Sequence, residues 1–292
     1  MAVRSLAFYR AVLTETGSGW SRNNVMRMSA ALAYYAIFSL APLLVIAMSV
    51  AGWLFGPEAV RGQLDDQLRS VMGAVPAKAV QSLVQSAAEP SKSIFAALLG
   101  FLTLLLGASG VFNQIQEALN EIWRMKSPTT PTGFQHIVRG FLFTRLLTFS
   151  MVLIIGFLLL ISLALSTAIA TLEQYAANLL PITASIIVLL GILVSLLMET
   201  VLFTLIFRIL PQTKVRWPHA LRGAAITAVF FEIGKWILSL YLGRESTTSG
   251  FGAAGSLVLV LLWLYYTSLI FFTGAEFTRA WMVVEEGAAG DD

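Results

Sequence analysis

Three ionisable side chains lie inside long apolar runs of this sequence: Glu199 in one run, and Glu232 and Lys235 in the next. A charge at the centre of a bilayer costs at least ~2.5 to 3.5 kcal/mol, so such side chains usually face a protein interior or a water-filled cavity. Two carboxylates and one ammonium leave one negative charge, which a proton, a cation or a bound solute would neutralise. This chemistry is typical of a transport site near the membrane centre. The alternative is a buried ion pair that fixes helix register, with Glu199 protonated.

The three side chains are expected at one depth because a short turn joins their helices. The sequence predicts antiparallel spans at about 182–209 and 220–242. Glu199 lies 10 residues before the end of the first span and Glu232 lies 12 residues after the start of the second. At about 1.5 Å per residue, both lie roughly 15 to 18 Å from the turn. A serine stands one helical turn from a charged residue on each helix. The predicted polar layer consists of Glu199, Glu232, Lys235, Ser195 and Ser239.

Composition places these helices in a membrane. Of 292 residues, 57% are hydrophobic and only 12% are charged, against ~25% charged in a soluble globular domain. Apolar runs that exceed the ~20 residues needed to cross a bilayer recur along the chain. The sequence therefore predicts an all-α membrane protein, a six-transmembrane-helix bundle with additional amphipathic helices. The spans are predicted at about 30–55, 94–112, 141–169, 182–209, 220–242 and 257–277.

The distribution of lysine and arginine predicts the orientation of the bundle. The termini and the loops on their side hold 12 basic residues, and the opposite loops hold 5. Because basic loops remain on the cytoplasmic side, both termini are expected in the cytoplasm. Residues 1–29 then form a cytoplasmic amphipathic tail, either a helix on the membrane surface or a solvated lead-in. Residues 56–93 form an outer amphipathic loop, and 278–292 form a short acidic tail.

Two further faces carry polar and small side chains at helical spacing. One lies in the first span, and the other runs from the second span into a polar extension. The parts within the membrane either line a cavity or form a packing seam, because small residues let helix backbones approach closely. The extension either lines a cytoplasmic vestibule or is a solvated face. The membrane faces consist of Tyr35, Ser39, Pro42, Gly107, Gly110 and Gln114, and the extension carries Glu117 and Glu121.

The residues needed for metal or covalent catalysis are sparse. The chain has no cysteine, and its two histidines, His136 and His219, lie in separate predicted loops. No usual metal-ligand spacing occurs, so we expect no catalytic residue, no metal site and no cofactor. The pI of about 9.3 is explained by basic residues beside the hydrophobic spans. We therefore expect that the protein has no nucleic-acid partner and is not an enzyme.

Several separated segments form a recognisable pattern in order along the chain. They are ALAYYAIFSLAP at 31–42, GASGVFNQIQEALNEIW at 107–123, ILPQTKVRW at 209–217, GFGAAGSLVLVLLWLYY at 250–266 and GAEF at 274–277. In these segments, and in the arginine-bearing start of the third span, the sequence resembles the YihY/BrkB family of bacterial inner-membrane proteins. The resemblance covers about residues 26–281.

This resemblance implies a six-helix bundle with cytoplasmic termini in the inner membrane. Family members have been linked to serum resistance, to movement of envelope lipid or lipopolysaccharide precursors and to solute export, and the family carries an old ribonuclease label. We expect a transporter for a small solute, such as an osmolyte, or for an amphipathic envelope lipid precursor. Its expected partners are membrane lipids and H+ or Na+. The alternative is a non-transport envelope-integrity scaffold. Ribonuclease activity is not expected, because metal-dependent hydrolysis needs clustered His, Asp or Glu.

Overall fold

The structure, a computed structural model, is helical throughout the residues that it describes. Among these residues the chain forms α-helices joined by short turns, and no strand occurs. Two of the described helices contain stretches long and apolar enough to cross a membrane, at Leu189–Ile209 and Leu257–Gly287. The described residues are 6–39, 68–69, 74–88, 110–124, 161, 181–213, 215–242 and 255–290.

Several sequence predictions fall outside this described part of the chain. They include the third span at 141–169 apart from residue 161, most of the second span, and the first span beyond residue 39. Two residues of the predicted faces, Pro42 and Gly107, also lie outside it. The count of six spans and the position of the termini therefore remain predictions.

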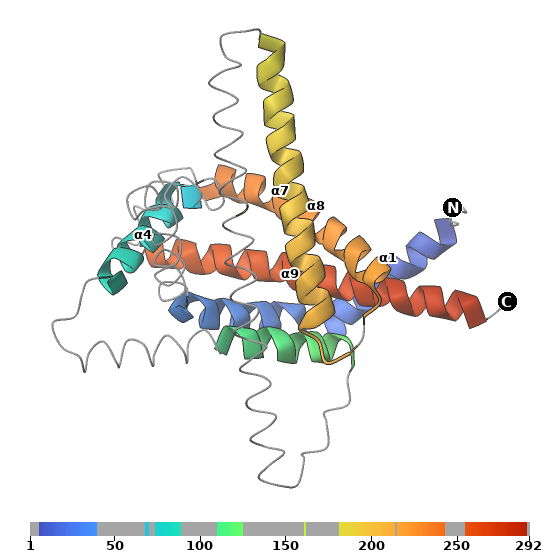
Figure 1. Cartoon of the computed structure of the whole chain (residues 1–292). Helices are drawn as coiled ribbons and strands as arrows, with labels where there is room; N and C mark the ends of the chain where they lie inside the picture. The colour runs from blue at the N-terminus through green and yellow to red at the C-terminus, as the bar shows by residue number, and fades with distance from the viewer. Residues whose placement is uncertain are drawn as a thin grey trace.

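Three long helices, α7 (Pro181–Ile209), α8 (Trp217–Leu242) and α9 (Gly255–Gly290), form the carboxyl-terminal part of the fold. Proline is the first residue of α7 and the second residue of α8. At these positions the fixed φ of proline suits a helix, and its missing N–H is not needed for a hydrogen bond. Helix α7 packs on α8, and α8 packs on α9. The amino-terminal part of α7, drawn yellow in Figure 1, extends away from the other described helices.

Helix α9 is longer than the span that the sequence predicts at 257–277. Its 36 residues extend about 54 Å at 1.5 Å per residue, against ~30 Å of hydrocarbon. The helix continues to Gly290, through the residues predicted as an acidic tail. Thr278 and Arg279 are buried there, so the first part of this segment packs against other helices.

Helices α8 and α9 meet at two glycines. A Cβ at Gly223 would lie 1.8 Å from Thr278 Oγ1, and a Cβ at Gly274 would lie 1.8 Å from Thr227 Oγ1. Each threonine therefore rests on the glycine of the other helix, which requires the two helices to run antiparallel. Each hydroxyl donates a hydrogen bond to the carbonyl four residues earlier in its own helix. These four residues form the glycine–threonine seam, a contact of the small-residue kind that brings helix backbones close.

The amino-terminal part of the chain covers α9. Helix α1 (Leu6–Arg22) packs on α9, and its Val12 and Gly19 are buried. Asn24 has φ of 49° in the turn that follows, and a second helix then occupies 25–39. Residues 6–22 are thus a packed helix rather than a solvated lead-in. Helix α4 (Ala74–Ala88) also packs on α9, near the amino-terminal end of α9 (Figure 1).

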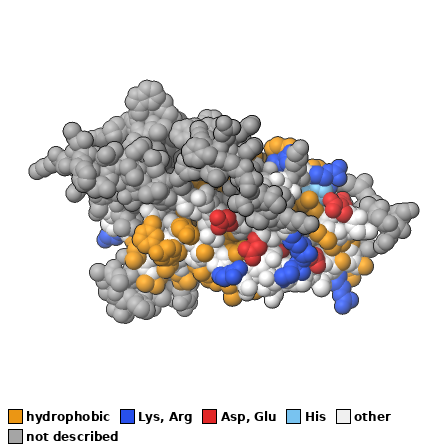
Figure 2. All heavy atoms as spheres, turned by 90° about the horizontal axis from the view of Figure 1, so that it is seen from below, with side chains coloured by type: hydrophobic (Ala, Val, Ile, Leu, Met, Phe, Trp, Pro, Cys, Tyr) orange, Lys and Arg blue, Asp and Glu red, His pale blue; other side chains and the backbone are white. Residues whose placement is uncertain are grey.

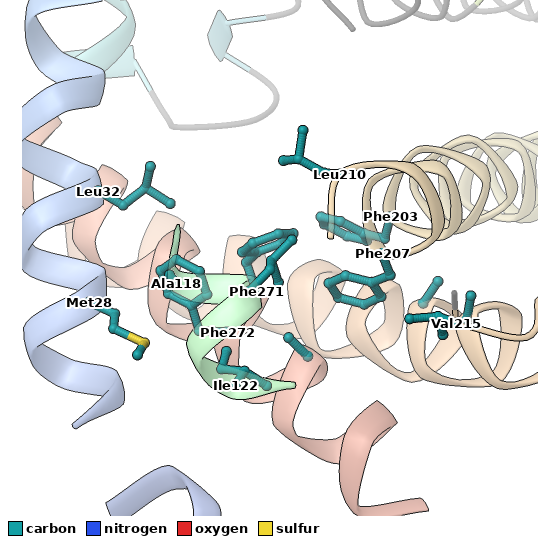
Figure 3. Close-up of a cluster of buried hydrophobic side chains, with 14 of the residues drawn as sticks. Met28, Leu32, Ala118, Ile122, Phe203, Phe207, Leu210, Val215, Phe271 and Phe272 are labelled. Atoms are coloured by element: carbon teal, nitrogen blue, oxygen red, sulfur yellow. The ribbon is translucent and has the colours of Figure 1, made fainter. Parts of the chain in front are cut away.

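The main hydrophobic core joins five helices. Side chains from 25–39, from the helix at 110–122, from α7, from α8 and from α9 meet in it (Figure 3). Phe207 and Phe271 lie at its centre with ring centroids 5.3 Å apart. Fully burying one such aromatic side chain contributes about 1.5 to 3 kcal/mol. This core fixes the end of α7 against α9.

The outer faces of α7 and α8 remain apolar and exposed. Leu197 is 60% exposed on α7, and Trp236 is 67% exposed on α8. Exposed apolar patches of this extent on a soluble monomer would mark a binding surface; here they suit contact with lipid. Figure 2 shows another face, on which acidic and basic side chains gather over one part and hydrophobic side chains lie beside them.

Candidate functional site

The structure brings together the three ionisable side chains of the predicted polar layer. Lys235 Nζ donates to Glu199 Oε1 at 2.7 Å and to Glu232 Oε1 at 2.9 Å. Glu199 is the middle residue of the apolar stretch Leu189–Ile209 of α7, and the other two lie one turn apart on α8. We call Glu199, Glu232 and Lys235 the charge triad. It places three charges at the centre of an apolar helix pair.

The surroundings of the charge triad are partly polar and partly aromatic. Ser195 Oγ lies 3.5 Å from Glu199 Oε1, one helical turn earlier on α7. The ammonium of Lys235 lies 5.4 Å from the centroid of the Phe231 ring, within the range of a cation–π interaction. The Glu199 and Lys235 side chains are each 14% exposed, and that of Glu232 is 26% exposed. The triad side chains are therefore mostly buried, but part of each remains exposed.

Pairing within the charge triad is incomplete. An ammonium has three N–H donors, and Lys235 directs two of them to carboxylates. Glu199 Oε2 is buried, and no described residue donates a hydrogen bond to it. With both carboxylates ionised, the triad carries one net negative charge. It can therefore accept a further positive charge or proton, for which Glu199 Oε2 offers an acceptor that no described residue occupies.

Of the other predicted site residues, Tyr35 and Ser39 lie in another part of the structure. Ser239 belongs to α8, but its side chain falls outside the described residues. Tyr35 lies against Gly110, where a Cβ would be 2.9 Å from the tyrosine ring. Ser39 is buried and donates to the carbonyls of Tyr35 and Ala36 in its own helix. Where they are described, these two faces pack against each other.

The polar extension after Gly110 contacts the end of α7 through residues that the sequence did not single out as contacts. Gln116 Nε2 donates to Leu210 O at 3.0 Å, and Asn120 Oδ1 accepts from the Gln212 N–H at 2.9 Å. These bonds satisfy backbone groups at the end of α7. The two predicted vestibule residues lie beside them: Glu117 is exposed, and Glu121 is exposed with an ion pair to Arg27 at 3.4 Å. Gln114, predicted on the membrane face, is half-buried.

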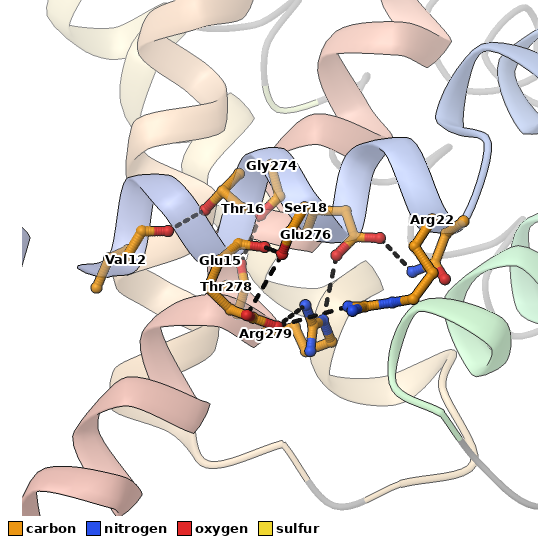
Figure 4. Close-up of polar contacts among 10 residues, drawn as sticks. Val12, Glu15, Thr16, Ser18, Arg22, Gly274, Glu276, Thr278 and Arg279 are labelled. Carbon is orange, nitrogen blue, oxygen red and sulfur yellow. Dashed lines mark hydrogen bonds and ion pairs between the residues drawn. The ribbon is translucent and has the colours of Figure 1, made fainter. Parts of the chain in front are cut away.

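A second cluster of charges, which sequence reasoning missed, joins α1 to α9. Arg279 donates from Nε to Glu276 Oε2 at 3.1 Å and from Nη2 to Glu15 Oε1 at 2.7 Å (Figure 4). Asn23 Nδ2 donates to Glu276 Oε1. Arg22 lies 3.5 Å from Glu15. We call these five residues the α1/α9 network. Its centre is deeply buried, because the Glu276 side chain is 0% exposed and that of Arg279 is 5% exposed.

The α1/α9 network depends on a glycine for space and changes the pKa of one of its own carboxyl groups. A Cβ at Gly19 would lie 2.4 Å from Glu276 Oε2, so only glycine lets α1 approach this carboxylate. The hydrogen bond from Arg279 lowers the pKa of Glu15 below its ordinary value, and the charges of Arg279 and Arg22 add to this effect. The sequence did show a glutamate at 276 followed three residues later by an arginine, a spacing that puts both on one helix face.

A smaller polar cluster joins the start of α8 to the end of α9. His219 Nε2 lies 2.9 Å from Glu285 Oε2, and Trp281 Nε1 donates to the same oxygen at 3.1 Å. Arg222 lies 3.6 Å from Glu285 and 5.8 Å from the centroid of the Trp281 ring. These contacts extend the antiparallel pairing of the two helices beyond the glycine–threonine seam.

Comparisons with known proteins agree with the resemblance seen in the sequence. The family described as Virulence factor BrkB matches residues 16–290. A UPF0761 membrane protein of Stenotrophomonas maltophilia is 28% identical over 266 residues, which are 89% of this chain and 59% of the relative. One of Tolumonas auensis is 31% identical over 256 residues, 85% of this chain and 77% of the relative. No solved structure matches the chain.

The matched region contains the functional candidates described above. It includes the whole charge triad, the glycine–threonine seam, and all of the α1/α9 network except Glu15. The chain spans 59% of the length of the Stenotrophomonas relative. The names of these relatives describe membrane proteins and name no enzyme. The resemblance to YihY/BrkB proteins is thus confirmed, and the chain belongs to the Virulence factor BrkB family of membrane proteins.

Proposed function

We propose that this protein is an inner-membrane transporter whose charge triad binds the transported solute or its coupling ion. One observation carries the proposal: Lys235 is shared by two carboxylates at the centre of the apolar helix pair α7 and α8. With both carboxylates ionised, one negative charge is left, and Glu199 Oε2 has no donor among the described residues. Ionisable groups inside an apolar helix pair are energetically costly. They are therefore rare, and those that occur usually pair with one another or mark a substrate or ion pathway. The substrate is a small solute or an amphipathic envelope lipid precursor.

The arrangement of helices supports a site that can change its partners. Glu199 is carried by α7, whereas Glu232 and Lys235 are both carried by α8. A movement of α7 relative to α8 would separate Glu199 from Lys235 and leave the pair on α8 together. A proton or Na+ arriving at Glu199 would replace the lost positive charge. Coupling of this kind links ion binding to the relative position of two helices.

A structural scaffold is the competing function, in which the charge triad only fixes the register of α7 against α8. Buried ion pairs can serve such a role. The two functions differ in what they require from the net charge. A scaffold tolerates a neutral, isosteric amide at Glu199 if the bundle still folds, whereas ion-coupled transport does not.

The experiment compares transport by isosteric variants in proteoliposomes. Purified protein is reconstituted with an internal pH-sensitive or Na+-sensitive dye and given a panel of zwitterionic osmolytes, amines and short-chain lipid precursors. We expect solute-dependent proton or Na+ movement by the wild type and its loss in Glu199→Gln and Glu232→Gln. Glu121→Gln, which changes an exposed ion pair, is the matched control and should transport normally. Transport at the wild-type rate by both triad variants would contradict the proposal.

A further inference from the structure

We infer that the charge triad binds a monovalent organic ammonium ion, which competes with Lys235 for Glu199. This inference rests on the proposed function, because it names the class of ligand for the same site. The geometry points to it through three observations: how Lys235 itself is held, which groups remain unsatisfied, and which side chain supplies the internal cation.

The first observation is that the site already binds an ammonium, that of Lys235. Two carboxylate oxygens accept from it at 2.7 and 2.9 Å, and the Phe231 ring lies beneath it at 5.4 Å. Phe203 packs edge-on against Phe231, with centroids 5.8 Å apart, and holds that ring in place. Carboxylates and an aromatic face are the groups by which proteins recognise ammonium ligands. Lys235 thus occupies its site as a tethered ligand.

The second observation is what Lys235 leaves unsatisfied. One of the two carboxylate charges remains after pairing, and Glu199 Oε2 is buried without a donor among the described residues. A ligand that satisfies both needs one positive charge and a group that binds a carboxylate oxygen. A protonated amine supplies both through its N–H groups, as the Lys235 ammonium already does at Glu199 Oε1, whereas an anion would add to the negative charge.

The third observation is that the internal cation is a lysine. A lysine ammonium is a compact charge on a flexible stem, whereas an arginine guanidinium binds carboxylates through a rigid fork. Lys235 pairs with Glu232 three residues earlier on its own helix and with Glu199 on α7. It can therefore release Glu199 to an incoming ammonium while its bond to Glu232 persists. Binding then breaks the link between α7 and α8.

The test measures ligand binding to the full-length protein, independently of transport. Thermal stability of purified protein is titrated with methylammonium, tetramethylammonium and Na+ at constant ionic strength. We expect methylammonium to stabilise the protein and to bind at least about tenfold more tightly than tetramethylammonium, which lacks an N–H donor; a tenfold difference corresponds to about 1.4 kcal/mol. Glu199→Gln should weaken methylammonium binding at least about tenfold, and Glu121→Gln should leave it unchanged.

A second variant tests the competition directly. Lys235→Gln removes the tethered ammonium, so methylammonium should bind more tightly to it than to the wild type. Equal stabilisation by all three cations, or unchanged methylammonium binding in Glu199→Gln, would overturn the inference. Weaker binding by Lys235→Gln would also overturn it. Transport that needs Glu199 without any methylammonium binding would reject the ligand class and leave the proposed function standing; methylammonium binding without transport would do the reverse.

Discussion

Two clusters in this molecule place one cation between two glutamates, and they differ in how completely the charges are paired. In the charge triad, Lys235 bridges α8 to α7; in the α1/α9 network, Arg279 bridges α9 to α1. Both cations stand three residues after a glutamate on their own helix. The triad leaves Glu199 Oε2 without a described donor, whereas both Glu276 oxygens accept hydrogen bonds.

This difference in pairing distinguishes a cluster that fixes the positions of its helices from a cluster that can take a new charged partner. The guanidinium of Arg279 reaches two carboxylates through different nitrogens, and Asn23 completes the pairing of Glu276. A buried, fully paired network of this kind fixes one arrangement of helices. The charge triad is more exposed than Glu276 and Arg279 at the centre of the network, and with both carboxylates ionised it has one unmatched charge. A new partner can therefore enter it without first displacing a complete network.

The largest expected effect comes from breaking the α1/α9 network at Arg279. Arg279→Met leaves the fully buried Glu276 without its cation, and stranding a buried charge costs about 3 to 5 kcal/mol. Unfolding of the purified variant in mixed detergent and SDS micelles measures the loss. The control is Arg27→Met, which removes an exposed ion pair to Glu121 and should change stability by less than about 1 kcal/mol. Equal losses in the two variants would contradict the structural role of Arg279.

The next effect concerns the glycine–threonine seam between α8 and α9. Gly274→Ala places a Cβ 1.8 Å from Thr227 Oγ1, and overpacking of a tight contact costs about 1 to 3 kcal/mol. The matched control is Gly191→Ala on α7, where nothing lies within 4 Å of the added Cβ. We expect the same unfolding assay to show destabilisation only at Gly274.

The sequence predicted the charge triad but not the α1/α9 network, for a geometric reason. Glu199 and Lys235 are 36 residues apart on two antiparallel helices joined by a short turn, so counting residues from the turn gives their depths. Glu15 and Arg279 are 264 residues apart, and no turn relates them. Helical spacing alone identifies residues on one face but not the helix that covers that face.

The fold shows the same limit. The apolar runs predicted helices where α7, α8 and α9 lie, because the hydrophobicity of a single segment is enough to indicate a membrane helix. The Tyr35 and Gly110 faces were both singled out, yet their mutual contact depends on the tertiary packing of two helices. The glycine–threonine seam, in contrast, has a signal in the sequence. Glycine precedes threonine by four residues in both GAAIT at 223–227 and GAEFT at 274–278, a small-residue pattern at one-turn spacing.

A double-mutant cycle at the charge triad should give a smaller effect than Arg279→Met. Lys235→Met leaves two carboxylates unpaired, but the triad is more exposed than Glu276, so a loss of about 1 to 3 kcal/mol is expected, between surface and fully buried pairs. Combining it with Glu232→Gln should restore part of that stability, because one of the stranded charges is removed. Unfolding of the wild type, both single variants and the double variant measures the coupling. Additive losses would show that the two side chains do not interact.

The smallest expected effect is the pH dependence contributed by Glu15 at the edge of the α1/α9 network. Arg279 lowers the pKa of this carboxyl from its ordinary value of 4.5, so the folded state holds the proton less tightly than the unfolded state. The stabilisation is therefore complete above pH 4.5 and disappears as the pH falls through the lowered pKa. Glu15→Gln removes this contribution, so the stability difference between wild type and variant should be constant at neutral pH and shrink in acid. The side chain is 29% exposed, which limits the difference to about 1 kcal/mol or less. A difference that grows as the pH falls would show that Glu15 is not held as a charged partner of Arg279. The network would then depend on Glu276 alone, and its contrast with the charge triad would be weaker.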